Sequence, residues 1–228
     1  MKLAEALPIL QAACGRPFGE LFVGHPEDLW TNKGNVGQLI LRYIGLELNS
    51  DLTDFEDGEL KTNKSLTNGL PLETMFITQI SKSIDALVGP APVPFVGSSL
   101  YSKIRNLLFL PVVKAGEDAS DWYFVRCVHV EAQEEGPLFR KLREDYETIC
   151  SGLRAHIETS TDGFIHTTNG PHYLQVRSKD VVPYHPIYSK TYDRLVSNKN
   201  HAFYFKKAFM IEAQMGYLEV PTMKLGDM

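Results

Sequence analysis

The sequence of residues 54–61, Asp-Phe-Glu-Asp-Gly-Glu-Leu-Lys, predicts a turn that runs into a β-strand. Asp57-Gly58 is a turn dipeptide, and the residues that follow it can continue in an extended conformation. Alternate residues of a strand point to the same face, so Glu59 and Lys61 project together while Leu60 enters the core. One face of this strand therefore carries the charged side chains.

A second carboxylate, that of Asp54, precedes the turn by a few residues. If Asp54 returns to the same edge of the strand, two carboxylates and one ammonium converge. That set suits an oxygen-liganded divalent cation such as Mg2+, together with a group that orients or deprotonates water, and so a hydrolytic site for phosphodiesters. Asp, Glu and Lys are also common in solvated surface turns, so the other parts of the chain must decide between the two interpretations.

Length and composition indicate an ordinary globular protein. A chain of 228 residues with 43% hydrophobic content suits one large domain or two lobes that share a core, and we expect residues 1–228 to form a single domain. Since no stretch approaches the roughly 18 uninterrupted apolar residues of a membrane span, we expect no membrane association and a cytoplasmic location. Three widely spaced cysteines predict neither a zinc site nor a disulfide framework.

Charge is distributed unevenly along the chain. The net charge of -5 argues against a protein that coats nucleic acid, yet residues 177–210 carry a net charge of +5 and the remainder carries -10. A basic face on an acidic body fits a protein that meets a polyanion along one surface, although solubility alone also explains it.

Hydrophobic periodicity and turn residues predict alternating helices and strands without internal repeats, and hence a mixed sheet flanked by helices. We expect helices within residues 1–30 and over 33–45, 98–106 and 137–157. We expect strands over 59–62, 74–80, 107–113, 122–130 and 172–178, followed by an aromatic and basic segment over 203–209. The helix over 33–45 begins with Lys33 and nearby glycines, which can receive a phosphate or can simply allow close packing.

Short motifs follow one another in a fixed order along the chain. They are Lys33-Gly34-x-x-Gly37, Asp54-Phe55, Glu59-Leu60-Lys61-Thr62, Pro71-Leu72-Glu73-Thr74-x-Phe76, Lys103 before Leu108-x-x-Pro111-Val112, Leu142-Arg143-Glu144-Asp145, Tyr173-Leu174-Gln175-x-Arg177-x-Lys179 and Phe203-Tyr204-x-Lys206-Lys207. Taken together, this ordered set resembles the MutH family of PD-(D/E)XK endonucleases, which comprises mismatch-repair nicking enzymes and related GATC-type type II restriction enzymes.

The resemblance implies an α/β fold with a PD-(D/E)XK restriction-endonuclease-like core, in which two lobes surround a DNA cleft. Residues 1–115 would then form mainly the catalytic lobe, and residues 116–228 mainly the DNA-recognition lobe. The implied activity is sequence-specific, metal-dependent hydrolysis of phosphodiester bonds in double-stranded DNA.

The same resemblance implies roles for individual residues at the catalytic site. Asp54, Glu59 and Leu60 would hold the metal, Lys61 would position the attacking water, and Lys103 would assist beside the scissile phosphate. The implied cofactor is Mg2+, with Mn2+ able to substitute. One acid or base side chain supplies only about 10^2- to 10^4-fold acceleration, so a metal must supply much of the very large acceleration that phosphate esters require.

A second set of residues is implied to bind DNA. The family places its base readers at Arg177, Lys179 and Tyr204, and this is chemically sensible because Arg and Lys donate to guanine and a tyrosine near adenine N6 can sense a methyl group. For Tyr204 a core aromatic on a strand face remains an alternative. The other implied DNA-binding residues are Lys33, Phe76, Lys206 and Lys207, and core packing remains an alternative for Phe76.

Two departures from the family pattern bear on the target and the role. Leu41 stands where the family carries a helix Glu, and four residues separate Asp54 from Glu59 where the family usually has six. The shorter spacing resembles the monomeric relatives MvaI and BcnI, which cut CC-GG type sites, whereas the motif around Arg177 favours a GATC-containing site. We expect the GATC target because specificity belongs to the lobe that contacts bases.

These departures favour a type II restriction enzyme. A MutH-type mismatch-repair nicking endonuclease, with mismatch-repair proteins as partners, is the alternative, and a non-catalytic DNA-binding effector module is a further one. Because one chain carries one active site, cutting both strands of a palindromic site would require two binding events or a transient homodimer.

Overall fold

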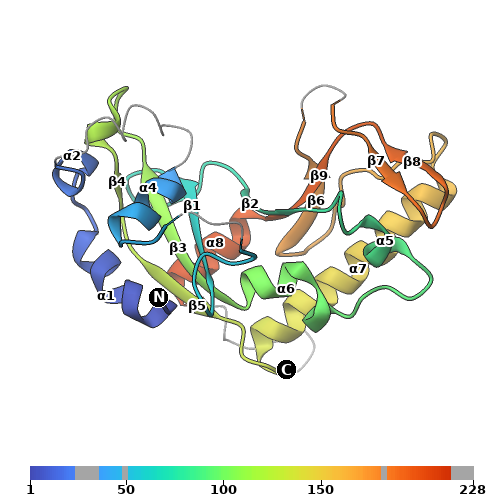
Figure 1. Ribbon diagram of the computed structural model, residues 1–228, viewed down its shortest axis with the longest axis horizontal. Coiled ribbons are helices and arrows are strands. Elements are labelled where there is room, and N and C mark those ends of the chain that lie inside the picture. Colours follow the sequence, from blue (N-terminus) through green and yellow to red (C-terminus); the bar gives the residue numbers. More distant parts are fainter. Residues whose placement is uncertain (24–35, 48–50, 181–183, 217–228) are drawn as a thin grey trace, which may run out of the picture. The chain divides into compact units, whose positions relative to one another are not determined.

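The computed structural model describes residues 1–23, 36–47, 51–180 and 184–216 of the chain (Figure 1). Its helices are α1 (Leu3–Ala13), α2 (Phe18–Leu21), α4 (Val36–Tyr43), α5 (Ile84–Val88), α6 (Ser99–Ile104), α7 (Pro137–Thr159), α8 (Lys207–Met215) and two short 3-10 helices, η1 (Phe95–Gly97) and η2 (Ala119–Asp121). Its strands are β1 (Glu59–Lys64), β2 (Met75–Gln79), β3 (Asn106–Val113), β4 (Tyr123–Phe124), β5 (Val128–Glu131), β6 (Leu174–Ser178), β7 (Ile187–Ser189), β8 (Arg194–Ser197) and β9 (His201–Phe205). The expectation of an α/β fold is confirmed.

The chain divides into two compact units. The first comprises Met1–Thr78 and Val96–Glu131, and the second comprises Gln79–Phe95 and Ala132–Met228. These units do not follow the boundary expected at residue 115. Strands β4 and β5 pair with β3 and therefore stay with the first unit, whereas α5 packs on α7 and joins the second.

The sheet of the first unit is mixed, as the sequence predicts. Strand β1 runs parallel to β3, with Glu59 beside Leu107 and Lys61 beside Phe109. Strands β4 and β5 pair with β3 in the antiparallel direction. Leu60 is 4% exposed and packs in one core with the apolar residues of α1 and α4, which confirms that it points inward.

The prediction of a single strand over 122–130 is wrong, because two short strands occupy this stretch. β4 pairs with Val112 and Val113 of β3, and β5 pairs with the opposite end of β3 from Asn106 to Phe109. Pro111 lies between these paired stretches, and a proline has no N–H to donate to a ladder. The pairing is therefore interrupted, and only the Pro111 carbonyl is used there, by the N–H of Val125 at 2.9 Å.

Helix α6 begins where the sequence predicts and ends earlier than predicted. The Ser98 hydroxyl accepts a hydrogen bond from the N–H of Tyr101 at 3.1 Å, which is the expected N-terminal cap. The helix ends at Ile104, and Asn106 already belongs to β3, where its side-chain amide donates to the Asp57 carbonyl at 3.0 Å. The early end lets the chain turn directly from Lys103 into β3.

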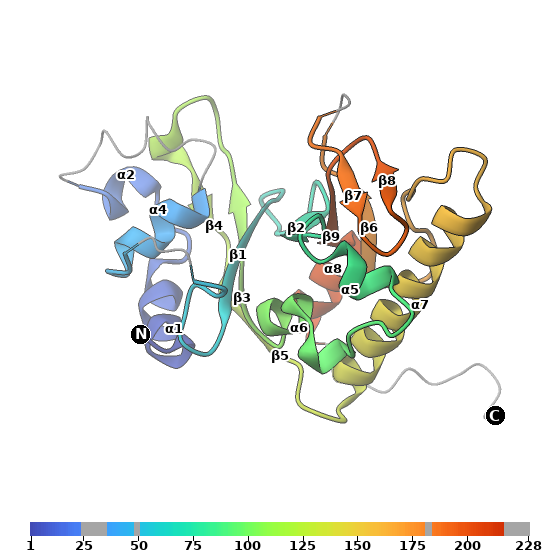
Figure 2. The same cartoon turned by 45° about the vertical axis from the view of Figure 1, so that its right-hand side comes forward.

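The second unit is built around α7, β6 and β9, which both views in Figure 1 and Figure 2 show together. Pro137 occupies the first turn of α7, and the predicted apolar stripe is buried along the helix. β6 and β9 form an antiparallel pair. The aromatic segment expected over 203–209 divides into the end of β9 and the start of α8, where the rings of Phe205 and Phe209 stack at 3.7 Å between centroids.

Helix α5 and the β7–β8 hairpin were not predicted from the sequence. Asp85 in the first turn of α5 joins them, because its carboxylate accepts hydrogen bonds from the Ser189 hydroxyl at 2.6 Å and from the N–H of Thr191 at 3.0 Å. None of the helices in the described part of the chain is long and apolar enough to cross a membrane. Cys14, Cys127 and Cys150 are free thiols.

Candidate active site

The acidic turn that precedes β1 is held in place from two sides. The Asp57 carboxylate accepts a hydrogen bond from the N–H of Leu3 at 2.8 Å, and the Asp57 carbonyl accepts one from Asn106. A Cβ at Gly58 would lie 2.6 Å from the Asn106 carbonyl oxygen, so only glycine allows the turn to approach β3 this closely. The turn therefore fixes the position at which Glu59 begins the strand.

Glu59 is the centre of the charged cluster. Its side chain is 2% exposed, and its Oε1 accepts hydrogen bonds from the ammonium groups of Lys61 and of Lys103, the latter at 2.9 Å. Lys61 lies two residues along β1, whereas Lys103 comes from the last turn of α6. Burying a carboxylate costs free energy unless it is paired and hydrogen-bonded, and these two cations supply the partners.

Asp54 completes the cluster from the turn. Its N–H donates to Oε2 of Glu59 at 3.2 Å, and its Oδ2 accepts a hydrogen bond from the N–H of Leu60 at 3.0 Å. Burial raises the pKa of Asp54, and the neighbouring Glu59 carboxylate raises it further, whereas Lys61 and Lys103 oppose the shift. The two carboxylates are thus held close together, which is unfavourable in free energy when both are ionised. A cation bound between them would remove this penalty.

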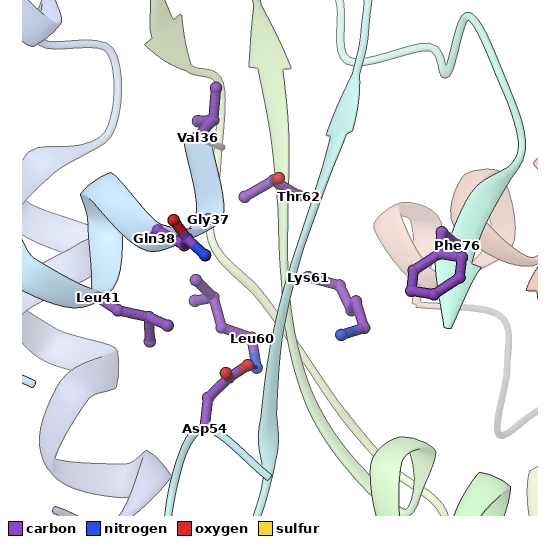
Figure 3. A pocket seen from close by; sticks show the side chains of 9 residues that line it. All are labelled: Val36, Gly37, Gln38, Leu41, Asp54, Leu60, Lys61, Thr62 and Phe76. Carbon is purple, nitrogen blue, oxygen red and sulfur yellow. Dashed lines mark hydrogen bonds between the residues drawn. The ribbon is translucent and has the colours of Figure 1, made fainter. Parts of the chain in front are cut away.

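A pocket of about 440 Å³ opens beside this cluster (Figure 3). Gln38 and Leu41 of α4 approach β1 from one side, and the Lys61 side chain leaves β1 on the other side (Figure 3). Leu41 is 7% exposed and lines the pocket together with Asp54, so the position where the sequence departs from the family pattern is an apolar part of the pocket wall. The full lining is Val36, Gly37, Gln38, Leu41, Asp54, Leu60, Lys61, Thr62 and Phe76.

The oxygen atoms at the pocket fit a hard divalent cation. Asp54 and Glu59 supply two carboxylates, and the main-chain carbonyl of Leu60 is a further oxygen of the kind that Mg2+ accepts. Among the described residues, no group of three or more His, Cys, Asp or Glu side chains could hold a metal ion. A metal here would therefore depend on two carboxylates, with carbonyl and water oxygens completing its ligands.

The predicted DNA-binding residues divide between the two units. Phe76 lies on β2 in the first unit, lines the pocket and is 37% exposed. Lys33 lies outside the described residues, so the prediction for it stays a prediction. The remaining five lie in the second unit and are Arg177, Lys179, Tyr204, Lys206 and Lys207.

Arg177 and Tyr204 lie together on adjacent strands of the second unit. The guanidinium of Arg177 lies 5.3 Å from the centre of the Tyr204 ring, within the range of a cation–π interaction. Tyr204 is half-buried rather than a fully buried core aromatic, and burial raises the pKa of its hydroxyl. The phenol therefore remains a hydrogen-bonding group at neutral pH.

The three lysines of the second unit differ in their surroundings. Lys179 is exposed just after β6, and its N–H donates to the Asn200 carbonyl at 2.8 Å. The Lys206 ammonium donates to the Gly170 carbonyl at 2.6 Å, whereas Lys207 is exposed at the start of α8. Lys206 therefore makes an internal contact that the sequence did not predict.

Asp145 is a buried charged residue whose role the sequence did not predict. It is 0% exposed, and its carboxylate accepts hydrogen bonds from the N–H groups of Tyr173 at 2.6 Å and Leu174 at 3.1 Å. Lys141 and His172 approach the same carboxylate at 2.9 and 3.0 Å. The available signal was a lone acid within the apolar stripe of α7, and its function is to fix the start of β6.

Comparison with known proteins agrees with the motifs. No family model matches the chain. The chain is 30% identical over 162 residues to the DNA mismatch repair protein MutH of Haemophilus influenzae strain PittEE, and 30% identical over 158 residues to that of strain PittGG. Each match covers 64% of this chain and 66% of the relative, just under two thirds of its length. With the ordered motifs already described, these matches support membership of the MutH family.

Proposed function

We propose that this protein is a sequence-specific endonuclease that hydrolyses double-stranded DNA with Mg2+, on a PD-(D/E)XK core. The observation that carries the proposal is the cluster at Glu59, where one buried carboxylate gathers Lys61 and Lys103 beside the Asp54 carboxylate. The relatives are named for DNA mismatch repair, which supports DNA as the substrate.

Asp54, Glu59 and the carbonyl of Leu60 would hold Mg2+, or Mn2+ in its place. When bound, the metal supplies charge stabilisation at the phosphate and lowers the pKa of a bound water. Burial is the main cause of the raised pKa of Asp54 and the Glu59 carboxylate raises it further; a cation held by both carboxylates would relieve this second contribution.

The two lysines divide the remaining work. An ammonium group has three N–H donors, and each lysine uses one of them on Glu59 Oε1. Lys61 therefore keeps donors with which to orient the attacking water, and Lys103 keeps donors for an oxygen of the scissile phosphate. Because both ammonium groups donate a hydrogen bond to the same oxygen of Glu59, they are held in place before the substrate binds.

The proposed target is a GATC-containing site. Arg177, Lys179 and Tyr204 supply the donors and the phenol for reading guanine and adenine edges in the major groove. A CC-GG type site, which the short spacing between Asp54 and Glu59 favours, is the competing target.

We propose a restriction role, because Leu41 and the short acidic spacing depart from the pattern of the repair enzymes. The name of the relatives favours the second candidate, a mismatch-repair nickase that depends on partner proteins. An effector that binds DNA without cutting it is the third candidate, and the apolar wall at Leu41 favours it.

Incubation of a supercoiled plasmid of known sequence with pure protein and Mg2+ tests the proposal. Rapid linearisation with ends that map to GATC supports the restriction role, through two binding events or a transient homodimer. Slow nicking that mismatch-repair proteins accelerate supports the nickase. Binding without any cutting in Mg2+ or Mn2+ contradicts the enzymatic proposal.

A further inference from the structure

One face of the β6–β9 pair carries polar side chains and the other face is buried. Leu174 and Val176 are 0% exposed, whereas Gln175 is half-buried and Arg177 is exposed. Because alternate residues of a strand share a face, Gln175 and Arg177 lie on the same face of β6.

The register of the pair places Tyr204 on that face as well. Gln175 lies directly opposite Tyr204, and Arg177 lies opposite the small side chain of Ala202. Directly opposite residues have Cβ atoms about 4.5–5.5 Å apart, so Gln175 adjoins the Tyr204 ring that the Arg177 guanidinium covers at 5.3 Å. Gln175, Arg177 and Tyr204 therefore form one polar cluster, which we name the reading face.

Gln175 has an unused amide. Its side chain makes no hydrogen bond to any residue within the described ranges, although it is half-buried. An amide offers both N–H donors and a carbonyl acceptor, and because the polar atoms of Gln175 are not fully buried, a ligand can reach them in place of water.

Hydrogen bonds to the two preceding residues fix the position of Gln175. The buried Asp145 carboxylate binds the N–H groups of Tyr173 and Leu174, immediately before Gln175. The N–H of Lys206 also donates to the Tyr173 carbonyl at 2.7 Å. The start of β6 is therefore held by α7 and by the end of β9, as a side chain that must meet a base edge in a fixed geometry requires.

The geometry points to Gln175 as a specificity-determining residue that reads an adenine in the DNA target, and this inference rests on the proposed function. The side-chain amide of Gln matches adenine N6 and N7 as a bidentate pair, as Arg matches guanine O6 and N7. Strand residues two apart are separated by about 6.6 Å, close to two base-pair steps of about 3.4 Å each. A strand that follows the groove would thus present Gln175 and Arg177 to bases about two steps apart.

Selection of bound duplexes from a randomised library, with Ca2+ in place of Mg2+, tests this inference without assuming a target. The wild type is expected to enrich a site that contains adenine at one position. Gln175→Ala should reduce the preference for that adenine about 5- to 100-fold and keep the other positions, because one bidentate pair is removed. Gln175→Glu should move the preference there towards cytosine, whose N4 donates to a carboxylate.

Two comparison variants separate the outcomes. Gln133→Ala removes an exposed glutamine elsewhere in the second unit and should leave the enriched site unchanged, whereas Arg177→Ala should lose a guanine position. If the wild type enriches a site and Gln175→Ala enriches the same site equally, the inference is wrong and the proposed function stands. If the wild type binds no duplex, both fail.

Discussion

The ammonium nitrogen of Lys103 lies 2.9 Å from Oε1 of Glu59, although 44 positions separate the two residues in the sequence. The Lys61 ammonium donates to the same oxygen, so one buried carboxylate positions two cations. Because α6 ends at Ile104 and the chain turns at once into β3, Lys103 is carried to the start of β1.

Removal of the Lys103 ammonium should affect hydrolysis much more than binding. In Lys103→Met we expect cleavage to slow about 10^2- to 10^3-fold, as for the loss of one preorganised donor, with duplex affinity nearly unchanged. Single-turnover cleavage and fluorescence anisotropy measure the two quantities. Lys82→Met removes an exposed charge in the second unit and should cut at the wild-type rate; an equal slowing of both variants would show that Lys103 acts only through net charge.

Asp54→Asn should be more stable than the wild type at neutral pH without metal. The pKa of Asp54 is raised in the folded state, so its contribution to stability is present below the unfolded value of about 3.9 and is lost as pH rises through the higher folded value. The stability advantage of Asp54→Asn should therefore grow as pH rises through that window and then level off. Thermal unfolding across the acidic range measures it, and an advantage that is constant with pH contradicts the explanation.

Addition of Mg2+ should make the wild type more stable than Asp54→Asn. A cation that binds only the folded state raises stability in proportion to the logarithm of its concentration once binding is saturating. Wild-type protein should therefore gain melting temperature with Mg2+, and Asp54→Asn should gain much less. Equal gains in both proteins would place the cation elsewhere.

Asp145→Ala should destabilise the second unit strongly. The change leaves two backbone N–H groups without their acceptor and removes the partner of Lys141, and breaking a buried ion pair in this way costs about 3–5 kcal/mol. Urea unfolding measures the loss. Glu144→Ala, the exposed neighbouring acid, should change stability by less than about 0.5 kcal/mol, and similar losses in the two variants would rule out the specific role of Asp145.

Alanine variants of Lys206 and Lys207 should distinguish a lysine that stabilises the fold from one that only contacts DNA phosphates. Lys207→Ala should lower the slope of log affinity against log salt by about 1 and leave stability unchanged. Lys206→Ala should also lower the free energy of unfolding, by about 0.5–1 kcal/mol, because its ammonium makes an exposed hydrogen bond to the Gly170 carbonyl. Anisotropy titrations at several salt concentrations and urea unfolding distinguish the two.

Local rules were sufficient to predict much of the fold. The period-2 placement of Glu59, Leu60 and Lys61, the proline at the start of α7 and the cap at Ser98 each depend on residues close in sequence. The break between β4 and β5 could not be predicted, because it depends on Pro111 in a different strand.

The site was less accessible to sequence reasoning. The spacing of Asp54, Glu59 and Lys61 indicated a cluster, but nothing local places Lys103 at Glu59, and only the family resemblance named it. The pocket wall formed by Gln38 and Leu41, and the internal contacts of Lys206 and Asp145, depend on tertiary packing that no periodicity encodes.

Cleavage of a labelled GATC-containing duplex by wild-type protein and by Glu59→Gln tests whether the charged cluster at Glu59 carries out hydrolysis. Glu59→Gln keeps the shape of the side chain and removes the charge that gathers Lys61, Lys103 and the cation. We expect the wild type to cut with Mg2+ and to stop when EDTA is added, and Glu59→Gln to bind the duplex without cutting it. Cutting by Glu59→Gln at the wild-type rate would show that the Glu59 carboxylate is not needed for hydrolysis.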